Sequence, residues 1–231
     1  MTMHVFHSGA WRTVTQPSVY HSGSWRQVKN GYVMHSGAWR EFYTQATSQV
    51  HQYYPTDTQA YRSTGAQRTD NGGRLYQGYY SSTYGEHRSM LMFNYSQIQS
   101  DLAGHTISSV TLRLYSDHFY YGDFNNPIGT TRHGVHNTAA TTAPASFSET
   151  SAYNSALGAE HNWPGGFTGA RDQEEIITLP NGVGEGLRDG TVKGLTLYAH
   201  STSQYYYCYF YGYDATAWNT KPLLTINSVG P

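Results

Sequence analysis

The chain has 231 residues, of which 13% are charged, and its formal net charge is -1. Such a balance lacks the basic footprint of a nucleic-acid binder or of a protein held at an anionic membrane surface, so we expect no nucleic-acid partner. The 22 tyrosines and 24 glycines favour strands, tight turns and aromatic surfaces, so we expect an all-β protein.

Export and membrane signals are weak in this sequence. Its start, MTMHVFHSGA, lacks the basic and apolar regions of a secretory signal, and no apolar run reaches the roughly 20 residues that span a bilayer. The single cysteine, Cys208, excludes an intramolecular disulfide. We expect a protein made in a cytosol without a signal peptide and without membrane insertion.

The first 43 residues contain one motif three times, as VFHSGAWRTV, VYHSGSWRQV and VMHSGAWREF, with a period of 14 residues. Two short strand-like runs around a Ser-Gly pair predict a β-hairpin in each unit. Because a lone hairpin is marginal in water, the three must pack on one another as a small prism or solenoid, or on sister chains. Residues 1–45 are therefore predicted to anchor or oligomerise the protein, with a homotrimer as the expected state.

The repeated side chains are the candidates for this coupling. Three histidines in register could bind a metal, but they are also explained as strand residues beside Ser and Gly, so we expect no metal and no cofactor. The arginines are expected to pair with carboxylates or to stack on a tryptophan of a neighbouring unit. The candidate oligomerisation residues are His7, Trp11, Arg12, His21, Trp25, Arg26, His35, Trp39 and Arg40.

A second region, residues 50–231, follows a boundary segment at 44–54 that has no strong apolar period. Val110, Leu112 and Leu114 alternate with polar residues, as Leu195 and Leu197 do, which predicts strands with one buried face. Long loops between such strands favour a two-sheet sandwich or a jelly roll. The GVGEG run is expected to be a loop, and further strands are expected to start at Arg88, Glu174, Gln204 and Pro222.

Two resemblances accompany these patterns. The repeats resemble the short G-x-W-(basic)-x-V units of structural and tail proteins of phages that infect actinobacteria. Residues 50–229 resemble the DNRLRE, or disaggregatase-related, β-sandwich domain, most closely in their first half. That family implies a jelly-roll sandwich similar to carbohydrate-binding modules, but supplies no binding-site motif to transfer. The matching residues are Asp57, Ala60, Asn71, Gly72, Arg88, Ser89, Leu91, Phe93, Ile107, Ser109, Leu112, Arg113, Leu114, Tyr115 and the closing PLLTI.

The run QYYYCYFYGYD is the sharpest local feature. With a period of two, Cys208 and Phe210 occupy one face, which is the better core face, and five tyrosines line the other. Such a ladder suits sugars, because tyrosine has an apolar body and a polar tip, but it equally suits a subunit interface or plain sheet packing. The candidate glycan-binding residues are Tyr205, Tyr207, Tyr209, Tyr211, Tyr213, Tyr120, Tyr121 and Asp123, with Tyr79, Tyr80 and Tyr84 nearby.

These features predict a phage virion protein, a minor tail or receptor-binding subunit whose sandwich binds host surface polysaccharide. Other virion proteins are expected partners through the repeats. The alternative is a purely structural capsid decoration or tail-tip protein, and a polysaccharide-degrading enzyme comes third. The few acidic residues define no acid and nucleophile pair by spacing, so no enzymatic activity is expected.

Overall fold

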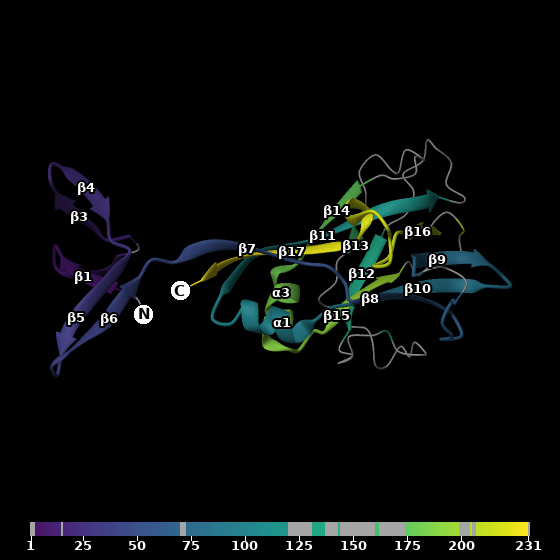
Figure 1. Ribbon diagram of the computed structural model, residues 1–231, viewed down its shortest axis with the longest axis horizontal. Coiled ribbons are helices and arrows are strands. Elements are labelled where there is room, and N and C mark those ends of the chain that lie inside the picture. The colour runs from purple at the N-terminus through teal and green to yellow at the C-terminus, as the bar shows by residue number, and fades with distance from the viewer. Residues whose placement is uncertain are drawn as a thin grey trace. The chain divides into compact units, whose positions relative to one another are not determined.

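The computed structural model describes residues 3–14, 16–69, 73–119, 131–136, 143, 160–161, 174–198, 204 and 207–230. Strands dominate this part of the chain, which contains two α-helices, so the all-β prediction is confirmed (Figure 1). The jelly-roll connectivity stays a prediction. The strands are β1 (Met3–His7), β2 (Ala10–Val14), β3 (Ser18–His21), β4 (Ser24–Gln27), β5 (Asn30–His35), β6 (Ala38–Thr44), β7 (Thr47–Tyr53), β8 (Asp57–Arg62), β9 (Leu75–Ser81), β10 (Gly85–Met92), β11 (Thr106–Phe119), β12 (Thr131–His136), β13 (Glu160–His161), β14 (Glu174–Leu179), β15 (Gly194–Tyr198), β16 (Cys208–Phe210) and β17 (Leu223–Gly230).

The helices are α1 (Tyr95–Asp101), α3 (Asn181–Asp189) and the 3-10 turn η3 (Trp218–Thr220). The chain divides into two compact units. The first unit comprises residues 1–48 with 229–231, and the second comprises residues 49–228. The sequence placed the change between residues 45 and 50. The segment that carried no apolar period includes the strand β7.

Each repeat in the first unit is a two-stranded antiparallel hairpin of its own, as predicted. The turn residues Ser8 and Gly9 have φ values of 52° and 80°, and the other two Ser-Gly pairs adopt the same conformation. Two consecutive positive φ values define a type I′ turn, whose twist matches that of the strands it joins. Glycine adopts this left-handed conformation without strain, whereas serine is strained in it. The residue types therefore account for the second position of the turn but not for the first.

The second unit contains one continuous set of hydrogen-bonded strands in the order β13-β12-β15-β10-β9-β16-β11-β17-β7. In addition, β14 pairs with β11, and β8 pairs with β10. Residues Val110–Tyr115 of β11 face Leu179–Glu174 of β14, whereas the end of β11 pairs with β16. The longest described strand, β11, therefore pairs with β14 over one part of its length and with β16 near its end.

The core of the second unit lies between the strands and the two α-helices. Val110, Leu112 and Leu114 of β11 are fully buried together with Leu195 and Leu197 of β15, as the alternation predicted. The same alternation fails for Thr196, which is also buried. β15 pairs with β10 and β12 along its two edges, and the burial of Leu195, Thr196 and Leu197 shows that both of its faces are covered as well.

The GVGEG run was predicted to be a loop, and this prediction is wrong, because it forms most of α3. Val183, Gly184, Gly186 and Leu187 form the buried side of this helix. A Cβ at Gly184 would lie 2.8 Å from a methyl group of Val110, so the missing side chain lets α3 approach β11 closely. Glycine lowers helix propensity, but tertiary packing outweighs this local preference here.

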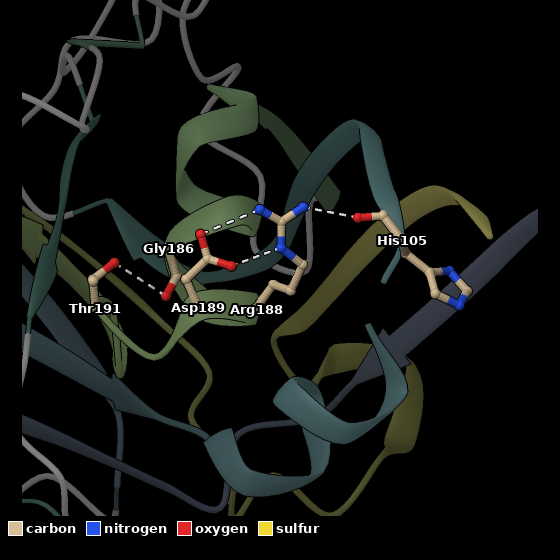
Figure 2. Close-up of polar contacts among 5 residues, drawn as sticks. All are labelled: His105, Gly186, Arg188, Asp189 and Thr191. Atoms are coloured by element: carbon tan, nitrogen blue, oxygen red, sulfur yellow. Dashed lines mark hydrogen bonds and ion pairs between the residues drawn. The ribbon is translucent and has the colours of Figure 1, made fainter. Parts of the chain in front are cut away.

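The end of α3 is fixed by polar contacts (Figure 2). Arg188 donates to the backbone carbonyl of His105 at 2.8 Å and forms two contacts with the carboxylate of Asp189 at 2.7 and 3.2 Å. Thr191 Oγ1 donates to the carbonyl of Gly186 at 3.3 Å. The Thr191 bond satisfies a carbonyl in the last turn of α3, and the Arg188 bond ties that turn to His105.

Candidate functional site

The predicted tyrosine ladder is only partly present. Cys208 and Phe210 are buried, as expected for the core face. However, β16 has only three residues, and Tyr207, which comes just before it, is 2% exposed, so the prediction that Tyr207 lines the outside is wrong. Its backbone N-H donates to the carbonyl of Gln204 at 3.0 Å, a turn that precedes the strand and breaks the alternation.

The other members of the ladder differ in their exposure. Tyr209 and Tyr211 are half-buried, and Tyr213 is exposed. The remaining predicted glycan-binding residues, Tyr205, Tyr120, Tyr121 and Asp123, lie outside the described residues. Tyr207 and Tyr209 therefore do not belong to one continuous face of five exposed tyrosines.

Instead, aromatic rings from two strands and a turn form a connected chain. From one end to the other, ring centroids are separated by 5.5 Å between Tyr84 and Tyr80, 4.9 Å between Tyr80 and Tyr207, 6.0 Å between Tyr207 and Tyr76, and 4.8 Å between Tyr76 and Tyr209. Tyr76 and Tyr209 are directly paired across β9 and β16, which explains their close stacking.

Three arginines lie over this chain of rings. The guanidinium carbon is 5.1 Å from the Tyr84 centroid for Arg62, 4.0 Å from that of Tyr76 for Arg68, and 5.9 Å from that of Tyr209 for Arg74. Arginine stacks on aromatic faces through its flat, delocalised charge. We call these eight residues the tyrosine–arginine cluster, which consists of Tyr76, Tyr80, Tyr84, Tyr207, Tyr209, Arg62, Arg68 and Arg74.

Arg68 is the best-held member of the cluster. Its Nη1 donates to Tyr207 Oη at 3.1 Å and lies 3.2 Å from His87 Nε2. Its backbone is fixed as well, because its N-H donates to the carbonyl of Ala60 and its carbonyl accepts from Gln59 Nε2. The loop that follows β8 therefore presents Arg68 in one defined orientation.

Charge at the other end of the cluster is set by Arg74 and Asp117, which form an ion pair. Burial acts to lower the pKa of Arg74, but the Asp117 carboxylate outweighs it and raises that pKa. Burial likewise raises the pKa of the Tyr207 hydroxyl, although Arg68 opposes this shift, so the phenol stays neutral near pH 7.

The cluster has a buried side and an open side. Tyr76 and Tyr207 are buried, while Tyr80, Tyr209, Arg62 and Arg68 are half-buried and Tyr84 is exposed. Buried hydrogen-bonded rings hold the exposed ones in place, as a binding surface requires. Aromatic faces beside guanidinium groups can stack on the apolar side of a sugar ring and donate hydrogen bonds to its oxygens.

In the first unit, the structure brings the predicted repeat residues onto equivalent positions of three hairpins. All nine of them are exposed: His7, Trp11, Arg12, His21, Trp25, Arg26, His35, Trp39 and Arg40. Their histidines interact locally, since Ser8 Oγ lies 3.0 Å from His7 Nδ1 and Ser36 Oγ lies 3.1 Å from His35 Nδ1. Within the described part of the chain, no group of three or more His, Cys, Asp or Glu side chains is arranged to hold a metal ion.

A second polar cluster lies beside β7 and β17. The hydroxyl of Ser228 is 3.0 Å from His51 Nε2 and 2.8 Å from His105 Nδ1, and the two imidazole centroids are 5.4 Å apart. Nearby, Tyr53 donates to the Asp101 carboxylate at 3.2 Å. Ser228 is 1% exposed, so a substrate cannot reach its hydroxyl. This arrangement of serine and histidine therefore stabilises the fold.

No protein-family model matches the chain, and no curated protein matches it. The resemblance to the DNRLRE domain and to phage tail repeats therefore stays a prediction. Within the described residues, no helix is long and apolar enough to cross a membrane.

Sequence reasoning found Tyr80, Tyr84 and Tyr209 but missed Tyr76 and the three arginines. Arg68 and Tyr207 are 139 positions apart, so no short motif contains both. The only local signal was the density of tyrosines in LYQGYYSSTYG, which did not indicate which rings would meet.

Proposed function

We propose that this protein is a phage virion protein, a minor tail or receptor-binding subunit, that binds host surface polysaccharide through the tyrosine–arginine cluster. One observation supports this proposal most directly. The cluster has a rigid buried half, centred on Tyr207 and Arg68, and an open half that includes Tyr84, Tyr80 and Tyr209. Binding residues held on a fixed scaffold lose little entropy when a ligand binds.

The composition of the open half fits a sugar better than a nucleic acid or a lipid. Tyrosine rings offer both an apolar face and a hydroxyl, and Arg62 beside Tyr84 adds donors that suit hydroxyl or carboxylate oxygens. The net charge of -1 opposes any strong, non-specific attraction to polyanions. No catalytic step is part of this proposal.

Self-association belongs to the same proposal. Single sugar sites bind weakly, and several sites on one particle increase the overall affinity by about 10²- to 10⁴-fold. The three hairpins of the first unit are the proposed means of joining copies, three per assembly, and of attaching them to other virion proteins.

A structural role in the particle, as a capsid decoration or tail-tip protein, is the competing proposal. It is favoured by the exposed tryptophans of the hairpins, since large exposed apolar groups mark protein interfaces. In that case the tyrosine–arginine cluster would contact a neighbouring subunit instead of a sugar.

Binding of the labelled full-length protein to actinobacterial cells and to isolated cell-wall polysaccharides tests the proposal. The variant Tyr84→Ala with Tyr209→Ala removes two open rings and leaves Tyr207 in place. Tyr95→Ala is the matched control, because Tyr95 of α1 lies outside the cluster and forms a similar cation–π pair with Lys193 at 4.5 Å.

We expect saturable binding that the double variant weakens at least tenfold and that Tyr95→Ala leaves unchanged, with each variant's thermal unfolding measured in parallel. An assembled wild-type protein that binds no polysaccharide would overturn the glycan proposal and favour the structural one. Equal weakening by Tyr95→Ala would show that the effect does not come from the cluster.

A further inference from the structure

The repeated residues of each hairpin divide between two faces. Directly paired residues of an antiparallel hairpin lie on the same side, and successive pairs alternate. In the first hairpin Phe6 pairs with Trp11, whereas the pairs on either side of it, Val5 with Arg12 and His7 with Ala10, lie on the opposite face. The other hairpins repeat this division: Tyr20 pairs with Trp25 and Met34 with Trp39, against Val19 with Arg26 and Val33 with Arg40.

We call the first side the tryptophan face, which consists of Phe6 and Trp11, Tyr20 and Trp25, or Met34 and Trp39. The second side is the arginine face, with the repeated Val, His and Arg. The two faces differ in chemistry. On the tryptophan face, each tryptophan is paired with a large apolar side chain. In the first two hairpins the paired rings meet edge to face, with centroids 5.3 and 5.4 Å apart.

The tryptophan face is open to solvent in a single chain. Trp11, Trp25 and Trp39 are 72%, 73% and 69% exposed, and their partners Phe6, Tyr20 and Met34 are also exposed. Each hairpin forms its own two-stranded sheet, and because their tryptophans stay exposed, the three hairpins do not bury these side chains in a shared intrachain core. Isolated hairpins with such side chains are marginal in water and need a partner surface.

The charges on the two faces determine which of them can pack against the same face of another copy. Residues 1–48 contain three arginines, one lysine and one glutamate, which gives this segment a net charge of +3 with histidines neutral. Each arginine lies on an arginine face, so two such faces packed together would place like charges against each other without water. Two tryptophan faces bring together rings and Met34, with His4 and Glu41 two positions further from the turns on the same side, and keep the arginines in solvent.

The area also suffices for a specific interface. A buried tryptophan contributes about 150–250 Å². Three of them from one chain amount to roughly 500 Å², and an equal contribution from a partner reaches the ~1,000 Å² that specific interfaces bury. All three hairpins must take part, because one tryptophan pair alone falls well below this area.

We propose that the tryptophan faces of the three hairpins pack against the tryptophan faces of other copies of this chain, with the arginine faces turned outward. This inference deepens the proposed self-association and rests on it, but it does not depend on glycan binding. It explains why the same exposed tryptophan occurs three times, at the same position of three hairpins.

The test compares the mass of the full-length protein in solution, by sedimentation and light scattering, with that of two triple variants. Trp11→Ala with Trp25→Ala and Trp39→Ala removes the tryptophan face. Arg12→Ala with Arg26→Ala and Arg40→Ala is the matched control that changes the opposite face. We expect an oligomer for the wild type and for the arginine variant, and a monomer for the tryptophan variant.

Loss of hairpin structure could also produce a monomer, so a measurement on the wild type accompanies the variants. On dilution through the dissociation range, acrylamide quenching of tryptophan emission should increase, because the three side chains become accessible as copies separate. An oligomer that persists in the tryptophan variant, or that dissociates in the arginine variant alone, would overturn the assignment of the interface to the tryptophan face. Constant quenching across dissociation would do the same.

These outcomes distinguish a failure of the interface assignment from a failure of the proposed self-association or of the proposed polysaccharide binding. A wild type that is monomeric at every concentration would remove self-association itself, whereas an oligomer unaffected by the tryptophan changes would remove only the choice of face. Polysaccharide binding is measured with variants of the second unit, so its failure leaves both results unchanged.

Discussion

Arg68 Nη1 lies 3.1 Å from the hydroxyl oxygen of Tyr207, a side chain that is 2% exposed. The guanidinium of the same arginine stacks on Tyr76. This contact joins the loop after β8 to the residue before β16 and places a charged group against a buried phenol. The rigidity of the tyrosine–arginine cluster follows from it.

Replacing Tyr207 should therefore lower the free energy of unfolding, independently of any effect on ligand binding. Tyr207→Ala removes a buried ring and should cost about 3–5 kcal/mol of unfolding free energy. Tyr207→Phe removes only the hydroxyl and should cost about 1 kcal/mol. Urea unfolding followed by far-ultraviolet circular dichroism measures both values. If Tyr207→Ala were as stable as the wild type, Tyr207 would not belong to the core.

Glu175 should make the protein less stable at alkaline pH. Its side chain shares the inner face of β14 with Ile177 and Leu179, and burial raises its pKa to about 7 from an ordinary value of 4.5. The pKa of Glu175 is higher in the folded chain than in the unfolded chain. The protonated side chain therefore contributes its full stabilisation below about pH 4.5, and this contribution is lost as the pH increases to about 7. Glu175→Gln should thus be more stable than the wild type at pH 8 and similar to it at pH 4.

The expected difference for Glu175→Gln at pH 8 is on the order of 1 kcal/mol, reduced from the full shift because the side chain is only half-buried. That corresponds to a Tm increase of about 2–4 °C for a chain of this size. Glu174→Gln, on the opposite and exposed face of the same strand, controls for the general effect of removing a negative charge. An equal gain at pH 8 in both variants would contradict the role of burial.

His51 should act in the opposite direction and weaken the fold in acid. Burial and the nearby His105 lower its pKa, while Asp101 partly raises it. Because the folded pKa is below the ordinary value of 6.5, the stabilisation is present above that pH and is lost as the pH decreases below it. His51→Gln keeps a group that can bond to Ser228 and should flatten the acid side of a plot of Tm against pH. An unchanged acid slope would show that other groups cause it.

The turn serines should be replaceable with a gain in hairpin stability. Ser8, Ser22 and Ser36 adopt φ values of 52°, 51° and 52°, a conformation that asparagine tolerates better than serine. Changing all three to Asn should stabilise each turn by a few tenths to about 1 kcal/mol. Amide hydrogen exchange of Val5 and Arg12, measured by NMR, should slow down in this variant. Faster exchange would argue against the type I′ geometry.

The hairpins show how much of the structure can be predicted from local sequence patterns. Ser-Gly between two strand-like runs indicates a turn from neighbouring residues alone, so the three hairpins were predicted correctly, whereas their registers come from the structure. The core of β11 followed in the same way, since Val110, Leu112 and Leu114 alternate with polar residues. In both cases the relevant interactions repeat along the sequence with the period of a strand.

Prediction failed where distant segments decide the outcome. Tyr207 has the same local pattern as its exposed neighbours, but contacts with Tyr76, Tyr80 and Arg68 bury it. Similarly, glycines in GVGEG indicate a loop, yet the close approach of Gly184 to Val110 makes a helix the better solution. Neither contact has a signature within a short window.

The all-β class, the three hairpins and the core face of Cys208 and Phe210 could thus be predicted from the amino acids, because these depend on turn chemistry and on the alternation of apolar residues. The folded chain was needed to see which tyrosines are buried, which arginines lie over them, and that the hairpin tryptophans stay exposed in one chain. The physical reason is that burial and cation–π contacts join residues far apart in the chain, and the folded backbone alone brings them within reach.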